Sequence, residues 1–163
     1  MTLVFLTSRS WISSAIRWVT GSEASHVAIC LELQGIPVFL HATVGGVQVS
    51  LRSKMMLGHS LVAEYECLTI PKGYVVGAAA HLGDRYDYVG IFGFALVIAA
   101  RRIGRRIRNP FASPRAEVCS ELVLSLDPRG ECVPPWAFLD PERTTPEDLL
   151  EVCRGRIDLF ARV

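Results

Sequence analysis

Residues 25–53 read SHVAICLELQGIPVFLHATVGGVQVSLRS, and this stretch decides the fold. Its apolar runs are rich in β-branched residues, which favours strands, and they lie at 25–33, 36–44 and 46–53. The pairs Gln34-Gly35 and Gly45-Gly46 separate the runs by the length of a tight hairpin turn. We therefore predict three consecutive antiparallel strands joined by short turns.

Further elements are predicted on both sides of this stretch. Strand-like runs lie at 2–6, 60–70 and the C-terminal end. Helices are predicted after the capping residues Ser8 or Ser10, from Pro71 to Leu82, over 88–103, from Cys119 and after Thr145. Strands come early and helices late, so the fold class is α+β, an antiparallel sheet of about five strands with helices packed on one side.

The composition fits one globular domain covering residues 1–163. Half of the residues are hydrophobic and 20% are charged, which allows a sizeable core. The net charge of +1 gives no electrostatic argument for nucleic-acid binding. The five cysteines are odd in number and lack the spacing of zinc sites, so neither a disulfide framework nor a metal or other cofactor is predicted.

The N-terminal residues and one apolar run are informative about secretion and membrane association. The N-terminal residues lack the pattern of a secretory signal, so we expect a cytoplasmic or membrane-peripheral protein. The run at 88–100 is shorter than the roughly 20 residues of a membrane span and is predicted to be a buried helix. The alternative is contact with a membrane surface through 88–108, because five arginines follow between 101 and 108.

Cys119 is the candidate nucleophile. It stands where a Pro- and Arg-rich loop leads into a helical run. A helix N-terminus favours thiolate over thiol, although buried packing is the commoner role of a cysteine. A histidine partner is therefore needed before Cys119 is assigned a chemical role.

His26 and His41 are the candidate partners. A hairpin centred on Gln34-Gly35 pairs position 28 with position 41, which puts both histidines on one face of the sheet, diagonally related. His59 falls in a predicted loop and His81 in a predicted helix, and neither is expected to be catalytic.

Several short motifs together resemble a known family. They are Ser25-His26-Val27-Ala28-Ile29, His41-Ala42, Tyr86-Asp87-Tyr88, Cys119-Ser120-Glu121-Leu122-Val123 and Thr145-Pro146-Glu147-Asp148-Leu149. In this order they resemble the circularly permuted papain-like enzymes of the NlpC superfamily, the YiiX-like group, which is related to the lecithin retinol acyltransferase family.

The resemblance implies a permuted papain-like fold and a cysteine hydrolase. Cys119 would be the nucleophile that forms a thioester, His26 the general base and His41 the orienting group. Tyr86, Tyr88 and Ser120 are candidates for lining the cleft, and a core position is an equal alternative for the two tyrosines. The expected substrate is an acyl group or peptide, and an amidase or peptidase acting on cell-wall peptides is the first expectation.

The resemblance also leaves alternatives open. Many YiiX-like sequences carry an acidic residue at the position of His41, whereas histidine there is more similar to the acyltransferase relatives, which act on lipids. A lipid hydrolase or acyltransferase at a membrane surface is therefore one alternative. A catalytically inactive binding module is the other.

Overall fold

The computed structural model describes residues 1–43, 45–70, 82–83, 85–86, 100, 103–105, 107, 116–117, 119–125, 135–140 and 144–163. The helices predicted at 71–82 and 88–103 fall almost entirely outside these residues. Across the described ranges, no helix has both the length and the apolar character needed to cross a membrane.

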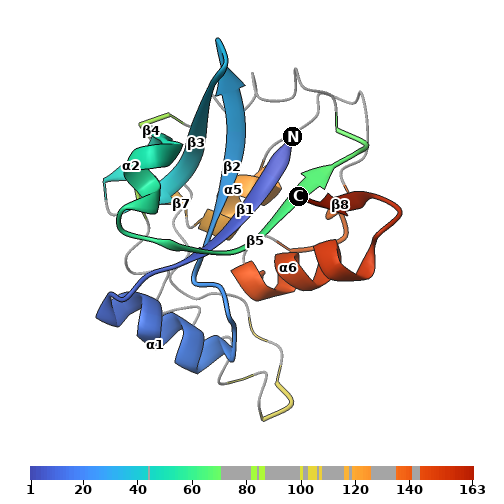
Figure 1. The fold of residues 1–163 in the computed structure, drawn as a ribbon. Coiled ribbons are helices and arrows are strands. Elements are labelled where there is room, and N and C mark those ends of the chain that lie inside the picture. The colour runs from blue at the N-terminus through green and yellow to red at the C-terminus, as the bar shows by residue number, and fades with distance from the viewer. Residues whose placement is uncertain are drawn as a thin grey trace.

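A six-stranded antiparallel sheet forms the centre of the structure (Figure 1). Its strand order is β4-β3-β2-β1-β5-β8. The bounds are β1 (Thr2–Thr7), β2 (His26–Leu33), β3 (Ile36–Thr43), β4 (Gly46–Leu51), β5 (Ser60–Cys67) and β8 (Phe160–Arg162). The sheet has one strand more than the five or so expected. A separate parallel pair joins β6 (Arg85–Tyr86) to β7 (Ala116–Glu117).

The hairpin of β2 and β3 has the register that the sequence predicts. Gln34 and Gly35 both have positive φ, 51° and 78°, which matches the right-handed twist of the strands they join. Ile29 lies opposite Leu40, so position 28 falls opposite position 41. The predicted positions of the two histidines on this hairpin are therefore confirmed.

The described helices follow their capping signals with one exception. Ser10 caps α1 (Trp11–Thr20), and Thr145 and Asp148 form a capping box on α6 (Pro146–Gly155). The helix α5 (Cys119–Ser125) begins at Cys119, as predicted. The exception is α2 (Arg52–Met56), whose first two residues were assigned to a strand; it has no side-chain cap, so no local signal marks its start.

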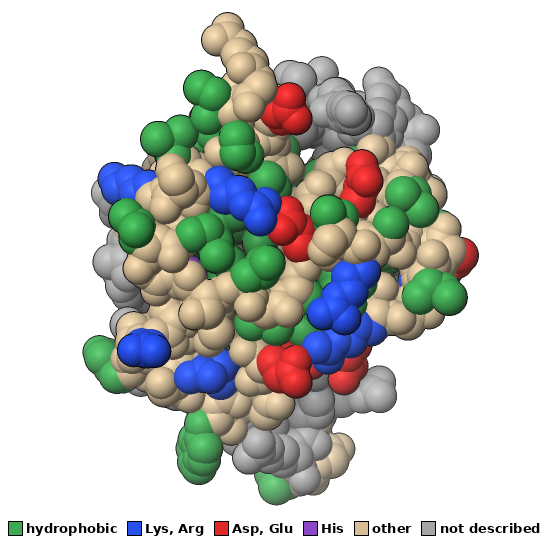
Figure 2. Space-filling model, viewed as in Figure 1, with side chains coloured by type: hydrophobic (Ala, Val, Ile, Leu, Met, Phe, Trp, Pro, Cys, Tyr) green, Lys and Arg blue, Asp and Glu red, His purple; other side chains and the backbone are tan. Residues whose placement is uncertain are grey.

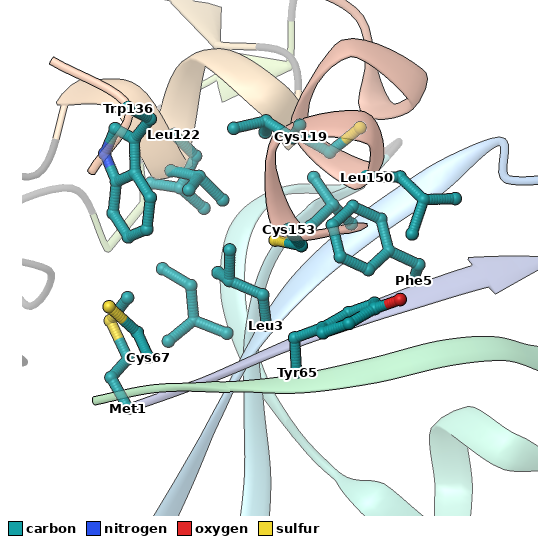
Figure 3. Packing of buried hydrophobic residues seen from close by; sticks show 14 of the residues in the cluster. Met1, Leu3, Phe5, Tyr65, Cys67, Cys119, Leu122, Trp136, Leu150 and Cys153 are labelled. Carbon is teal, nitrogen blue, oxygen red and sulfur yellow. The ribbon is translucent and has the colours of Figure 1, made fainter. Parts of the chain in front are cut away.

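The sheet is covered on both faces, which corrects the expectation of helices on one side only. One face packs against α5 and α6 through a cluster that includes Leu3, Phe5 and Val27 (Figure 3). The other face carries a smaller cluster of Val4, Leu6, Ala28, Phe39 and Met55, the last from α2. Alternate residues of each strand point to opposite faces, so parity along a strand decides which helix a side chain meets.

Candidate functional site

His26 and His41 lie side by side on the face that α2 covers. His26 opens β2 and His41 stands near the end of β3. Their ring centres are 5.5 Å apart and the rings meet edge to face at 79°. His26 lies two residues before Ala28 on β2 and so points to the same face, where Ala28 packs in the smaller cluster with Met55 of α2. The structure thus brings together two of the three residues predicted to act as one unit.

A third histidine joins this pair. His59 lies in the loop between α2 and β5, as predicted, and its ring centre is 6.0 Å from that of His26. Its Nδ1 is 3.1 Å from the carbonyl oxygen of Met55, and this nitrogen donates because a carbonyl only accepts. Sequence reasoning missed this neighbour because the uncapped helix α2 is what places His59 beside the sheet.

Burial keeps the two central imidazoles neutral. His41 is 1% exposed, while His26 is half-buried with its Nε2 buried. Burial, and then the nearby His41 and His59, lowers the pKa of His26 to about 3. Burial, and then His59, lowers the pKa of His41 to about 4. At neutral pH both rings therefore have a lone pair that can accept a proton.

Two buried nitrogens of the pair lack a hydrogen-bond partner. They are Nε2 of His26 and Nδ1 of His41. The opposite nitrogen of His41, Nε2, lies 3.0 Å from the hydroxyl oxygen of Ser50 on β4. Buried polar atoms without partners are uncommon and costly, and Nε of Arg17 and Nε1 of Trp136 are the other such atoms among the described side chains.

A hollow of about 540 Å³ opens beside His41. Polar and apolar side chains from β3, β4, α2 and the loop after it form its walls, together with Gly58. The side chains are those of His41, Thr43, Gln48, Val49, Ser50, Leu51, Lys54, Met55 and His59. The volume falls within the range of small-molecule sites. The hollow and the histidines therefore form one candidate site.

Cys119 lies elsewhere. It begins α5, and this helix contacts β2 and β3 as predicted. Its side chain is 6% exposed and packs in the cluster of the opposite face, near Leu122 and Leu150 in Figure 3. Val27 belongs to that same cluster, whereas its neighbour His26 points to the α2 face. The structure therefore does not bring Cys119 onto the histidine pair, and the buried Nε2 of His26 has no hydrogen-bond partner among the described residues.

The expected cleft residues are placed differently. The hydroxyl of Ser120 is buried and donates to the carbonyl oxygen of Thr144 at 2.7 Å, so Ser120 does not line a cleft, which corrects that expectation. Tyr86 is described only as part of β6, and Tyr88 and His81 lie outside the described residues. In the described part of the chain, no three His, Cys, Asp or Glu side chains are placed to hold a metal ion.

Comparison with known proteins finds similarity among solved structures. No protein-family model and no curated protein matches the sequence. Among solved structures, the chain is similar to the crystal structure of YiiX from Escherichia coli O157:H7, described as a metalloprotein and as DUF1105. The TM-score is 0.54 at 16% identity, with 99% of this chain and 94% of that chain covered. This likeness establishes a YiiX-like fold over nearly the whole chain.

Proposed function

We propose that this chain hydrolyses or transfers acyl groups through a covalent acyl-enzyme intermediate, with His26 and His41 moving the protons. The observation that carries the proposal is the pair of buried, neutral imidazoles beside a hollow of ligand size. A neutral imidazole accepts the proton of an attacking hydroxyl or thiol and returns it to the leaving group. The YiiX-like fold agrees with the hydrolase that the sequence motifs imply.

The nucleophile of the acyl-transfer step is assigned from the sequence motifs. The sequence motifs imply Cys119, with His26 as base and His41 as orienter, in a thioester mechanism on peptides or other acyl substrates. The thiol lies on the opposite face of the sheet from the histidines, so this assignment stays a prediction. The neighbouring YiiX is described as a metalloprotein. The described His, Cys, Asp and Glu side chains do not group around a common metal position.

The test is turnover of a panel of acyl substrates, an ester, a thioester and a peptide amide, by the wild type and three variants. We expect His26→Ala and His41→Ala to lower kcat/KM by at least about 100-fold, as removal of general acid–base catalysis does. Loss of activity in Cys119→Ala identifies the thioester route. Unchanged kcat/KM in both histidine variants, with circular dichroism like that of the wild type, contradicts the proposal.

A second candidate function, a lipid hydrolase or acyltransferase at a membrane surface, is favoured by the outer side of α1. Trp11 and Trp18 are each 78% exposed and lie seven residues apart, on the same side of the helix. Arg9 and Arg17 are near them in sequence, and residues 7–22 contain no acidic side chain. Figure 2 shows hydrophobic and basic side chains over α1 at the lower left. Indole rings with cationic neighbours suit a membrane interface with anionic lipids.

Vesicle flotation tests this second candidate. We expect the protein to float with vesicles that contain phosphatidylserine, and the variant Trp11→Ala/Trp18→Ala to remain at the bottom of the gradient. The matched control is Leu57→Ala, which removes an apolar side chain 89% exposed on another part of the surface. Equal flotation of the wild type and the double variant contradicts membrane binding through α1.

A further inference from the structure

Ser50 is the side chain that the structure adds to the site. It stands on β4 opposite Phe39, which is two residues from His41 on β3. Its hydroxyl oxygen lies 3.0 Å from Nε2 of His41 and lines the hollow. A hydroxyl at this distance from the nitrogen of a neutral histidine is the arrangement that nucleophilic catalysis by serine requires.

The far side of His41 completes the arrangement. A neutral imidazole carries its proton on one nitrogen and accepts on the other. If the proton of His41 is on Nδ1, Nε2 accepts from Ser50, and the N–H of Nδ1 belongs to a ring whose centre is 5.5 Å from that of His26. In this tautomer Ser50 donates to His41, whereas in the other tautomer Nε2 of His41 donates to Ser50 and cannot take its proton.

We propose that Ser50 is the nucleophile of this site, with His41 as its general base and His26 as a positioning residue, acting on small acyl esters. This inference rests on the proposed acyl-transfer function, replaces Cys119 as the attacking residue and assigns the proton transfers to His41 alone. Contacts within resting sites are often looser than those in the substrate complex, which fits the gap between the two imidazoles.

The reaction balances with the groups present. The oxygen of Ser50 bonds to the ester carbonyl carbon while its proton passes to Nε2 of His41. The carbon–oxygen bond to the alcohol then breaks, and the alcohol leaves with that proton. Water repeats the sequence on the acyl-serine, which releases a carboxylic acid and restores Ser50 and neutral His41. Neutral His26 stabilises the imidazolium form of His41 less than a carboxylate in its place would. We therefore expect esters rather than amides as substrates.

The walls of the hollow agree with an acyl ester. Val49, Leu51 and Met55 supply apolar surface for a short acyl chain, and Lys54 supplies a cation. A positive charge beside the reacting carbonyl would favour the negative oxygen of the tetrahedral intermediate.

The experiment uses the full chain with a fluorophosphonate probe, followed by peptide mass spectrometry, and turnover of p-nitrophenyl butyrate. We expect one adduct, on Ser50, and a loss of at least about 100-fold in kcat/KM for Ser50→Ala. Ser53→Ala is the matched control, because Ser53 is an exposed serine three residues away, and it should label and turn over like the wild type. Should Ser50→Ala fold poorly, Ser50→Cys retains the contact with His41 and should be alkylated by iodoacetamide at that position.

Nitrogen NMR of the imidazoles tests the positioning role of His26. We expect the proton of His41 on Nδ1 in the wild type, and a shift of population toward Nε2 in His26→Ala. A proton on Nε2 of wild-type His41, or a wild-type protein without an adduct on Ser50, overturns the inference. Turnover lost in Cys119→Ala but retained in Ser50→Ala also overturns it while leaving the proposed function standing. An adduct on Ser50 without turnover of any acyl substrate supports the reactive serine and counts against the proposed function.

Discussion

Arg52 and Glu64 form a two-point ion pair that fixes α2 to the sheet. Nη1 and Nη2 of Arg52 lie 2.7 and 2.8 Å from the two carboxylate oxygens of Glu64 on β5. The guanidinium also lies over the ring of Phe39, 5.6 Å from its centre. Because α2 supplies Lys54 and Met55 to the hollow, this pair holds a wall of the candidate site.

The first prediction is that Arg52→Lys destabilises the fold by about 1–2 kcal/mol, because an ammonium cannot reproduce the two parallel hydrogen bonds to a carboxylate that is largely buried. Urea denaturation measures this free energy of unfolding. The matched control is Arg156→Lys, whose two-point pair with Asp158 is exposed and should leave the free energy of unfolding nearly unchanged. Equal effects in the two variants would contradict the structural role given to Arg52.

The second prediction concerns acid. In the unfolded chain His26 and His41 bind protons below about pH 6.5, whereas in the folded chain burial lowers their pKa values to about 3 and 4. The stability that the neutral pair contributes is therefore fully present above pH 6.5 and is lost as the pH falls from 6.5 toward 4. Each histidine adds a slope of at most about 1.4 kcal/mol per pH unit.

Urea denaturation between pH 7 and pH 5 checks this slope, in a range where most carboxylates remain charged. In His41→Gln the amide retains an acceptor for Ser50 but does not titrate, so the loss of stability with acid should be shallower than in the wild type. Imidazole proton NMR should show two histidines that do not titrate above pH 5. If the resonances of His26 and His41, assigned with single-histidine variants, titrate near pH 6.5, the pair is not buried as the structure places it.

The sequence predicts the hairpin and its consequences because the signals there are local. Gln34-Gly35 sets the turn, the turn sets the register, and the register puts His26 and His41 on one face. The helix start at Cys119 and the capped helix after Thr145 are predicted for the same reason, since caps and loop-to-helix transitions are encoded within a few residues.

The face of the sheet on which Cys119 lies, relative to the face that carries the histidines, is not set by any local sequence signal. The sequence therefore did not predict it. Which face of the sheet α5 covers depends on the packing of Leu122 and Val123 against Val27, not on any signal at the cysteine. The positions of His59 and Ser50 beside the histidine pair also depend on packing and strand pairing rather than on local sequence signals. The uncapped helix α2 brings His59 to the pair, and the pairing of β3 with β4 brings Ser50 to His41.

The third prediction concerns Ser120, which the structure makes a packing residue. Its hydroxyl donates to the carbonyl of Thr144 and so connects the first turn of α5 to the residue before the cap of α6. Ser120→Ala leaves that carbonyl without this donor and should lower the free energy of unfolding by about 1–2 kcal/mol. Ser14→Ala, on the exposed side of α1, is the control and should change it by less than about 0.5 kcal/mol. An unchanged free energy of unfolding in Ser120→Ala would contradict this packing role and leave Ser120 as a candidate cleft residue.

The fourth prediction uses the three tryptophans, which lie in two different environments. Trp11 and Trp18 are 78% exposed, whereas Trp136 is 1% exposed and stacks on Phe160 at 6.2 Å between ring centres. Iodide should therefore quench most of the fluorescence of the wild type. Trp136→Phe should remain quenchable, and Trp11→Phe/Trp18→Phe should resist iodide.

Vesicles containing phosphatidylserine should protect the two exposed indoles and shift their emission to the blue, because rings at a membrane interface leave water. Protection by vesicles of phosphatidylcholine alone would remove the basis for a contact driven by the arginines. Protection in the absence of any lipid, rising with protein concentration, would instead indicate that a second copy of the chain covers α1.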